Sequence, residues 1–237
     1  MTANIRTIAE TGSTNADLIA LAGKGVPEGL WLRAERQTGG RGRLARTWES
    51  PQGNLYCSTI VRLRTYDPSP GMLALVAAVA VHEAVGLFLA PDKVIIKWPN
   101  DLLVQGAKLC GMLLERAGDA IIIGIGLNIA HHPDLPDRPA TSLAACGAGN
   151  IGPGYFLETL AEIFARWLEI WRGQGLAPIR TYWLKHAHPP GTALKANLPD
   201  GSTLEGLFAG LDNDGALILR LANGTSHAIH AGDIFLI

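Results

Sequence analysis

The sequence predicts an α+β fold: a mixed, largely antiparallel sheet packed against helices, with a small β-barrel at the C-terminus. First, apolar β-branched segments follow one another with only short turns between them, and consecutive strands joined in this way pair antiparallel. Second, Ala- and Leu-rich or Trp- and Phe-rich segments have the length and patterning of helices. Third, the chain changes character near residue 190, after which Asp-Gly and Asn-Gly turns separate short alternating strands.

Five segments are candidate strands of the sheet. Each is rich in Val, Ile or Leu and is bounded by Gly, Pro or Asp, a pattern typical of buried strands. These segments are residues 30–34, 55–63, 93–97, 109–115 and 120–129.

Four segments are candidate helices. The run TNAD at residues 14–17 has the form of a capping box and predicts a helix start. Ser69 and Pro70 supply an N-cap and a proline at the first helical position of a long apolar stretch. Because His82 and Glu83 interrupt that stretch, we expect a buried helix rather than a membrane span. The predicted helices cover residues 16–22, 72–90, 155–172 and 179–186.

The run HPPG at residues 188–191 predicts a linker between two units. We therefore divide the chain into a main domain, residues 1–187, and a C-terminal β-barrel, residues 191–237. A chain of 237 residues is long enough for one large core with such an appendage.

Composition excludes several classes of protein. The formal charge is -1 and only 17% of residues are charged, below the roughly 25% of an average chain, so nothing favours DNA or an anionic membrane as partner. The three cysteines, Cys57, Cys110 and Cys146, form no Cys-x-x-Cys pair, which suits a reducing compartment. With no secretory signal at the N-terminus, we expect a cytoplasmic protein.

The most unusual segment is GGRGRLARTWES at residues 39–50. Residues 40–45 match the dinucleotide fingerprint G-x-G-x-x-G/A, but no apolar helical face follows, so this interpretation fails. No P-loop motif occurs in the sequence. What remains is a flexible glycine loop whose arginines suit bidentate contacts with phosphate or carboxylate oxygens. The alternative is a solvated surface loop whose arginines have no particular role.

Three further runs place polar groups or glycines in apolar strands. They are KWPND at 97–101, KLCGMLLE at 108–115 and GIGLNI at 124–129. The first is also an ordinary turn sequence, and a β-bulge would account for the two glycines of the third. A glycine inside a strand, such as Gly111, suggests that a ligand or another part of the chain lies close to the backbone.

Together these runs resemble the catalytic domain of biotin protein ligases. The loop at residues 40–46, followed by Trp48, looks like the arginine-glycine loop of that family, and the three later runs keep the family's order and spacing. The resemblance implies the fold of class II aminoacyl-tRNA synthetases and biotin ligases, with an SH3-like C-terminal barrel suggested by the turn at residues 210–217. One departure is that Leu44 and Ala45 stand where the family often has an arginine and a glycine.

The resemblance implies an ATP-dependent biotin-[acetyl-CoA-carboxylase] ligase. In the first half-reaction the biotin carboxylate attacks the α-phosphate of ATP, with Mg²⁺ on the departing pyrophosphate. In the second, biotinyl-5'-adenylate acylates a lysine of a biotin carboxyl carrier protein or domain. Because the first step brings two anions together, cations must offset their repulsion.

The resemblance also implies which residues form the site. Catalytic roles fall to Lys108, Arg43 and Asp101. Biotin contacts fall to Ser13, Thr14, Asn15, Gln37, Gly40, Arg41, Gly42, Arg43, Lys108 and Gly111. Nucleotide contacts fall to Arg43, Arg46, Trp48, Asn100, Asp101, Lys108 and Asn128.

Among these, we expect Lys108 to bridge the carboxylate and the α-phosphate, and Asp101 to orient the acceptor amine or take its proton. We expect the arginine loop to act as a lid that is disordered without ligand and that shelters the labile adenylate. The C-terminal barrel would dock the acceptor or complete the ATP site. His131 and His132 form a metal pair on one interpretation and a solvated loop on the other, and we predict no metal ligands in the chain.

Several alternatives stay open at this point. A lipoate-protein ligase of related fold would also join a cofactor acid to a carrier lysine. A non-catalytic biotin-binding sensor would be expected if the lysine and the arginines were missing, and a generic mononucleotide-binding domain would leave Ser13 and Gln37 without a role. Only twelve residues precede Ser13, so we expect no DNA-binding domain and a monofunctional enzyme. The sequence leaves the oligomeric state open, a homodimer included.

Overall fold

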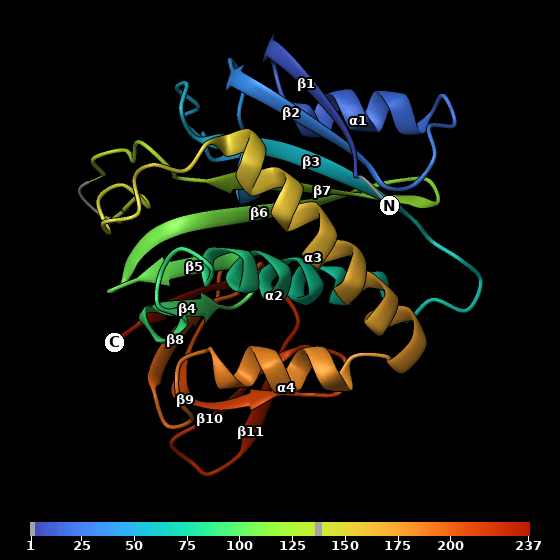
Figure 1. Ribbon diagram of the computed structural model, residues 1–237. Coiled ribbons are helices and arrows are strands. Elements are labelled where there is room, and N and C mark those ends of the chain that lie inside the picture. The colour runs from blue at the N-terminus through green and yellow to red at the C-terminus, as the bar shows by residue number, and fades with distance from the viewer. Residues whose placement is uncertain (1–2, 136–138) are drawn as a thin grey trace.

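The computed structural model describes residues 3–135 and 139–237 (Figure 1). Its main element is a seven-stranded sheet in the order β1-β2-β3-β7-β6-β5-β4. β1 and β2 are parallel, whereas every other neighbouring pair is antiparallel, as the sequence predicts. The strands are β1 (Asn4–Thr11), β2 (Leu30–Gln37), β3 (Leu55–Arg62), β4 (Val94–Lys97), β5 (Asp101–Val104), β6 (Ala107–Ala117) and β7 (Ala120–Leu127).

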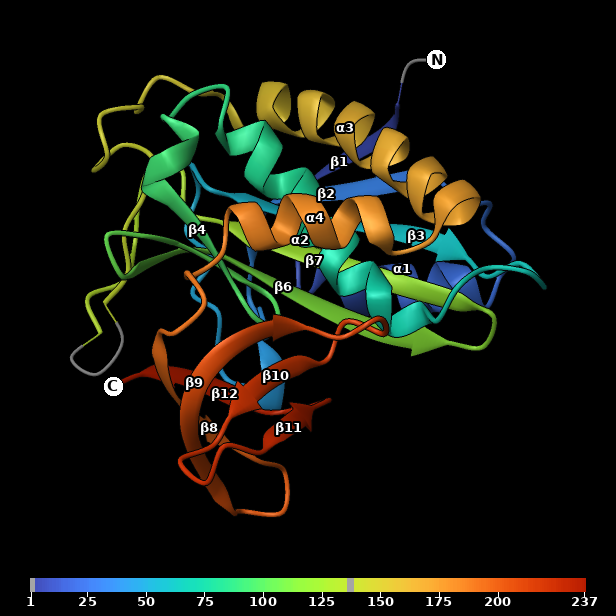
Figure 2. The same cartoon turned by 90° about the horizontal axis from the view of Figure 1, so that it is seen from below.

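Four α-helices cover the two faces of this sheet. They are α1 (Thr14–Ala22), α2 (Leu73–Val85), α3 (Pro153–Gln174) and α4 (Ala177–Lys185). Short 3-10 turns lie at Arg43–Ala45, Pro70–Met72 and Pro91–Lys93. α1 packs on one face of the sheet, and α2 packs on the other face against both α3 and α4 (Figures 1 and 2). That position explains why nearly every residue of α2 is buried and why its sequence shows no polar face.

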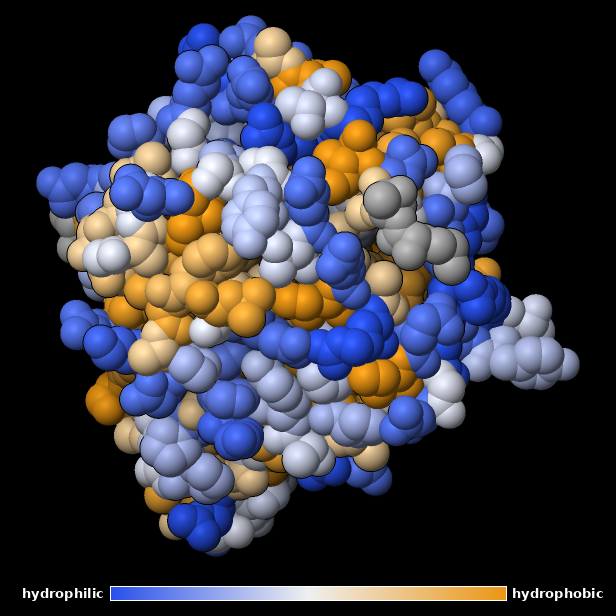
Figure 3. Space-filling model, in the orientation of Figure 1, coloured by the Kyte–Doolittle hydropathy of each residue, from blue (hydrophilic) through white to orange (hydrophobic). Residues whose placement is uncertain are grey.

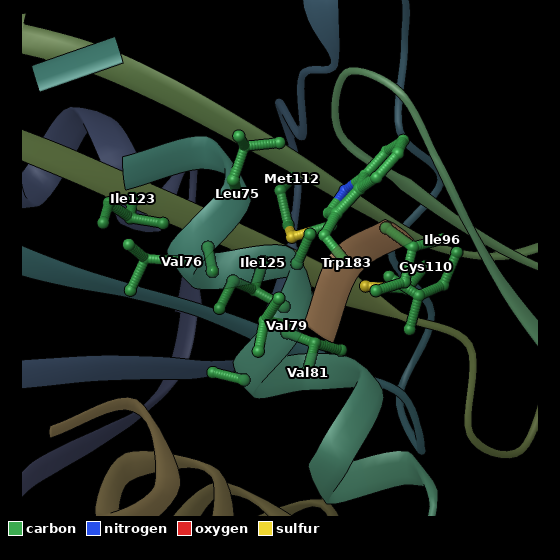
Figure 4. Close-up of a cluster of buried hydrophobic side chains, with 14 of the residues drawn as sticks. Leu75, Val76, Val79, Val81, Ile96, Cys110, Met112, Ile123, Ile125 and Trp183 are labelled. Carbon is green, nitrogen blue, oxygen red and sulfur yellow. The ribbon is translucent and has the colours of Figure 1, made fainter. Parts of the chain in front are cut away.

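The two faces of the sheet bury alternate residues of the same strands. In β7, Ile122 packs with Leu18 of α1, while Ile121 and Ile123 belong to the larger core under α2. Because side chains alternate along a strand, each strand can serve both cores at once. Figure 4 shows part of the larger core, where side chains of α2, β6 and β7 meet Trp183 of α4.

The C-terminal unit is a five-stranded antiparallel sheet in the order β11-β10-β9-β8-β12. It packs beside the main sheet, and Phe208 and Leu217 join the larger core. The face shown in Figure 3 carries hydrophilic residues over much of this unit and an apolar band across the middle of the molecule. The strands are β8 (Ala193–Asn197), β9 (Thr203–Leu211), β10 (Leu217–Arg220), β11 (Ser226–Ile229) and β12 (Asp233–Leu236).

The predicted strands and helices are present with shifted ends, and two strands were missed. β1 escaped prediction because it is an exposed edge strand of mixed polarity, and β5 because its first residue, Asp101, belongs to the turn-like run KWPND. The apolar stretch at 72–90 is helical only as far as Val85, since the chain turns at Gly86. No helix of the described residues is long and apolar enough to cross a membrane.

The predicted capping box is wrong. α1 begins at Thr14 with Ser13 at the N-cap, and no side chain makes a capping hydrogen bond. The side chain of Asp17 instead accepts a hydrogen bond from the hydroxyl of Thr11, at 2.6 Å. Ser69 likewise makes no capping bond, and Pro70 opens a 3-10 turn ahead of α2. The polar groups at the start of α1 are used elsewhere, in the site described below.

Arg172 links α3 to two loops, the one before β2 and the one after β3. Arg172 of α3 is almost fully buried and donates to both carboxylate oxygens of Glu28 at 2.7 Å, and also to Asp67 at 3.2 Å. The bond with Glu28 raises the pKa of Arg172. Burial opposes ionisation of Glu28, but the hydrogen bonds from Arg172 and from the Arg62 backbone lower its pKa on balance. This cluster fixes the end of α3 to the loops before β2 and after β3.

We expect Arg172→Met to lower the free energy of unfolding by about 3–5 kcal/mol, because Glu28 and Asp67 would lose the buried cation between them and Glu28 would keep only the exposed Arg64. The matched control is Arg166→Met, which removes an arginine of the same helix that pairs with Glu83 and is half exposed. That change should cost less than about 1 kcal/mol. Urea denaturation of both variants measures the difference, and equal losses would contradict this role for Arg172.

A histidine on α2 makes stability depend on pH. His82 is buried, with Nε2 3.1 Å from the carbonyl of Val94 and Nδ1 3.0 Å from the hydroxyl of Tyr182. Since a carbonyl only accepts, Nε2 carries the proton and Nδ1 accepts from Tyr182. Burial, helped by nearby His186, lowers the pKa of His82 from 6.5 to about 4.

Between pH 6.5 and about 4 the unfolded chain therefore binds a proton at this residue that the folded chain does not. We expect the free energy of unfolding to fall with decreasing pH in this window, by up to about 1.4 kcal/mol per pH unit. His82→Gln keeps a donor and an acceptor but does not titrate, so urea denaturation should show a shallower pH dependence. An unchanged slope would mean that other groups cause the acid sensitivity.

Candidate functional site

A cavity of about 280 Å³ opens on the face of the main sheet that carries α1. Its walls come from the start of α1, the loop after β2, the middle of β6 and β7, and the loop after β7. Asp233, the first residue of β12, completes the rim, so both sheets contribute to the cavity.

The start of α1 forms a polar end of the cavity. Ser13, Thr14 and Asn15 are all buried. The backbone N–H of Thr14 donates to Oε1 of Gln37, the last residue of β2, at 2.9 Å. The Thr14 hydroxyl lies 2.7 Å from that of Ser58, which in turn donates to Oδ1 of Asn15 at 2.6 Å. Buried polar groups need such partners, which explains why these side chains do not cap the helix.

The glycines of β6 and β7 make room for side chains that lie on the sheet. A Cβ on Gly124 would come within 2.3 Å of the Asn15 amide oxygen, and one on Gly126 within 2.6 Å of the Trp48 indole. A Cβ on Gly111 would contact both Trp48 and Lys108 at 3.0 Å. The register of β7 with both neighbours is unbroken along these residues, so the β-bulge interpretation of the two glycines is wrong. Close approach of other side chains explains them.

Lys108 and Asp101 form an ion pair beside Trp48. The Lys108 ammonium lies 2.7 Å from Oδ1 of Asp101 and 5.4 Å from the centre of the Trp48 ring. The register of β5 and β6 shifts between Leu102 and Leu103, and the backbone of Lys108 pairs with the loop after β7. Lys108 therefore lies near the start of β6, where the strand pairs with β5 on one side and with the loop after β7 on the other, and it lines the cavity.

The arginine loop folds back on itself as a short hairpin, with Arg41 paired to Thr47. Gly42 donates its N–H to the carbonyl of Arg46, and Trp48 donates to the carbonyl of Gly40. At its tip, Leu44 and Ala45 have φ angles of 54° and 55°, in the left-handed region that favours glycine. Leu44 and Ala45, which stand where the resemblance places an arginine and a glycine, therefore adopt a backbone conformation that is unfavourable for both residues.

Each loop arginine lies near a carboxylate. Arg41 is 3.4 Å from Glu115 of β6. Arg43 lies 3.7 Å from Asp233 and donates to the carbonyl of Gly232 at 3.1 Å and to Oδ1 of Asn100 at 3.4 Å. Arg46 pairs with the other oxygen of Asp233. The alternative of a solvated loop whose arginines have no role does not describe this arrangement.

Asparagines hold the loop that forms the far wall. Asn128 donates to the carbonyl of Thr141 at 3.0 Å. Oδ1 of Asn54 accepts from three successive backbone N–H groups, those of Ile129, Ala130 and His131, at 2.9–3.0 Å. Among the described residues of this loop, Pro133, Leu135 and Ala140 line the cavity.

The metal interpretation of the histidine pair finds no support in the part of the chain that the structure describes. The His132 ring lies 3.2 Å from the Ser142 hydroxyl. No group of three or more His, Cys, Asp or Glu side chains in residues 3–135 and 139–237 is placed to hold a metal ion.

The thiols of the site are not nucleophiles. Cys57 lines the cavity, and burial, with Cys110 nearby, raises the pKa of its thiol. Burial likewise raises the pKa of Cys110. Both therefore stay protonated at neutral pH. The chemistry that the arrangement supports is binding and charge stabilisation by Lys108 and the loop arginines.

The structure brings the predicted site residues together. All of them line the cavity except Gly40, which lies behind it, where a Cβ would meet the Trp48 carbonyl at 2.4 Å. Sequence reasoning missed Ser58, Glu115, Asn54 and Asp233. A polar residue inside the apolar strand 55–63 is a signal that could have found Ser58, whereas Asp233 lies far away in the sequence with no local signal.

Comparisons with known proteins agree with this geometry. Residues 14–128 match the model of the biotin/lipoate A/B protein ligase family, and residues 193–237 that of the biotin protein ligase C-terminal domain. A biotin–[acetyl-CoA-carboxylase] ligase of Paracoccus denitrificans is 37% identical, covering 96% of this chain and 98% of the relative. The bifunctional ligase/repressor BirA of Bacillus subtilis is 34% identical over 94% of this chain and 71% of its own length.

Solved structures show the same fold. A biotin protein ligase from Aquifex aeolicus in complex with biotin and ATP superposes with a TM-score of 0.87 at 26% identity, covering 99% of this chain and 98% of that one. A ligase from Leishmania major in complex with biotinyl-5-AMP gives 0.69 at 25% identity, covering 96% and 99%. Since the likeness spans both units and nearly the full length of a 37% identical relative, the chain belongs to the biotin protein ligases of the biotin/lipoate A/B protein ligase family.

Proposed function

We propose that this chain is an ATP-dependent biotin protein ligase, which forms biotinyl-5'-AMP and transfers biotin to a lysine of a carboxylase carrier domain. One observation carries the proposal: a single cavity has a hydroxyl- and amide-lined end at Thr14 and Asn15 and a cationic end at Lys108 and the loop arginines. The first suits an uncharged polar ring, and the second suits a carboxylate beside a phosphate.

In the first step a biotin carboxylate oxygen attacks the α-phosphorus, the new P–O bond forms, and pyrophosphate leaves. Lys108 is the group we assign to both anions, because its ammonium has three donors and only one is needed for Asp101. Arg43 and Arg46 hold phosphate oxygens, and Asn100, which contacts Arg43, positions that guanidinium. Trp48 and Asn128 form the nucleotide wall.

In the second step the acceptor amine attacks the acyl carbon, an amide forms, and AMP leaves with the bond electrons. The amine must be neutral to attack. Asp101, at the cavity wall beside Lys108, is the carboxylate that orients this amine and receives its proton in our proposal. The C-terminal unit takes part through Asp233, which holds two of the loop arginines.

Mg²⁺ enters this proposal with ATP rather than through a preformed protein site. Of the three carboxylates that line the cavity, Asp101 and Asp233 are already paired with Lys108 and with the loop arginines, and Glu49 belongs to no cluster of three possible ligands in the described residues. Magnesium is often held largely by substrate phosphates, where it neutralises their charge. We place the reaction in the cytoplasm, where three free cysteines are stable.

The proposal is tested by incubating the purified chain with biotin, Mg²⁺ and ATP labelled in the α-phosphate, followed by a biotin carrier domain. We expect labelled biotinyl-adenylate, then biotin on the carrier lysine with release of AMP. Failure of both steps would refute the assignment. Lipoate outcompeting biotin would favour a lipoate ligase, and biotin binding without adenylate would favour a sensor.

Lys108→Ala should separate chemistry from folding. We expect adenylate formation to slow by at least about a hundredfold, because one preorganised charge facing the transition state is lost. The melting temperature should fall by only a few degrees, because the lysine is one-third exposed although Asp101 loses its partner. Lys195→Ala, which removes a lysine of β8 that does not line the cavity and pairs with Glu205, is the control. Adenylation at the parent rate by Lys108→Ala would contradict the role given to this lysine.

A further inference from the structure

The orientation of one buried amide can be deduced from its neighbours. One side-chain atom of Asn15 lies 2.7 Å from a carboxylate oxygen of Glu115 and 3.3 Å from the carbonyl of Leu113. A backbone carbonyl only accepts hydrogen bonds, so that atom is the amide nitrogen. The amide oxygen of Asn15 must then point the other way, toward Ser58.

The direction of the next two hydrogen bonds follows. The Ser58 hydroxyl lies 2.6 Å from the Asn15 oxygen, which cannot donate, so the one hydrogen of Ser58 is used there. Ser58 must consequently accept from the hydroxyl of Thr14, at 2.7 Å. The single hydroxyl hydrogen of Thr14 is in turn committed to Ser58.

This leaves two acceptor oxygens facing each other at the cavity. Oε1 of Gln37 lies 3.2 Å from the Thr14 hydroxyl oxygen, and it already accepts from the Thr14 backbone N–H at 2.9 Å. With the Thr14 hydrogen directed to Ser58, no hydrogen lies between the two oxygens. Thr14 and Gln37 both line the cavity, so the pair is a receptor for an N–H group of a ligand.

We propose that Ser58 and Glu115 are positioning residues that fix this polarity and thereby select a ligand with an N–H donor. The inference rests on the proposed function, in which the donor is a ureido N–H of biotin. A cofactor acid whose ring lacks N–H donors, such as a dithiolane, would leave both oxygens unsatisfied. Ser58 is fully buried and does not line the cavity, so it acts through Thr14.

The test compares two ligands on four forms of the full chain: the parent, Ser58→Ala, Ser58→Cys and Thr59→Val. Dissociation constants are measured for biotin and for a cyclic carbonate analogue in which oxygen replaces both ureido N–H groups. Ser58→Ala releases the Thr14 hydrogen, which can then turn to Gln37. The control Thr59→Val removes the next hydroxyl along β3, which lies on the opposite face and donates to Leu30.

We expect Ser58→Ala to bind biotin about tenfold more weakly, the effect of one mispaired buried hydrogen bond. Its affinity for the carbonate analogue should stay within about twofold of the parent value, because that ligand has no N–H to lose. Thr59→Val should leave both affinities unchanged. Ser58→Cys keeps the side-chain size and a weak donor, so its affinity for biotin should lie between those of the parent and of Ser58→Ala. This variant replaces Ser58→Ala in the test if the alanine variant is unstable.

Two results would overturn the inference: unchanged biotin affinity in Ser58→Ala and Ser58→Cys, or an equal loss for biotin and the analogue, which would indicate a purely structural role. A parent chain that binds neither ligand would instead refute the proposed function. The selectivity between the two ligands therefore separates the two failures.

Discussion

The site depends on three missing side chains. Gly111, Gly124 and Gly126 lie side by side on β6 and β7. A Cβ on Gly124 or Gly126 would overlap Asn15 or Trp48, and one on Gly111 would press on Trp48 and Lys108. Without these glycines the start of α1 and the arginine loop would be held away from the sheet by the width of a methyl group. The polar and cationic ends of the cavity would then no longer lie against the same part of β6 and β7.

The same constraint explains why the pocket forms on this face of the sheet. Strands β3, β6 and β7 bury large apolar residues against α2 on one side, and this large core holds their positions. On the other side α1 is short, and its apolar contacts involve only a few residues, among them Leu18 and Ile122. Past the N-terminal end of α1, the loop after β2 lies over the sheet in place of a helix.

Much of this could be predicted from the sequence. Apolar segments bounded by turn residues gave five of the seven main strands, and the four motif runs gave the family, which the comparisons confirm. Local sequence patterns gave wrong predictions where a side chain bonds to a residue far away in the sequence. Thr14 and Asp17 have the form of a capping box, but Gln37 and Ser58 on two strands compete for Thr14, and Thr11 binds Asp17. Asp233 reaches the arginines only through folding of the C-terminal unit.

The arginine loop is tied at both sides, by Arg41 to Glu115 in the main sheet and by Arg43 and Arg46 to Asp233 in the C-terminal sheet. It therefore links the two sheets across the rim of the cavity. Because Phe208 and Leu217 also join the two units in one hydrophobic core, the position of the C-terminal sheet fixes where the positive charges of Arg43 and Arg46 lie over the cavity. Packing in that shared core therefore helps to shape the charged end of the cavity.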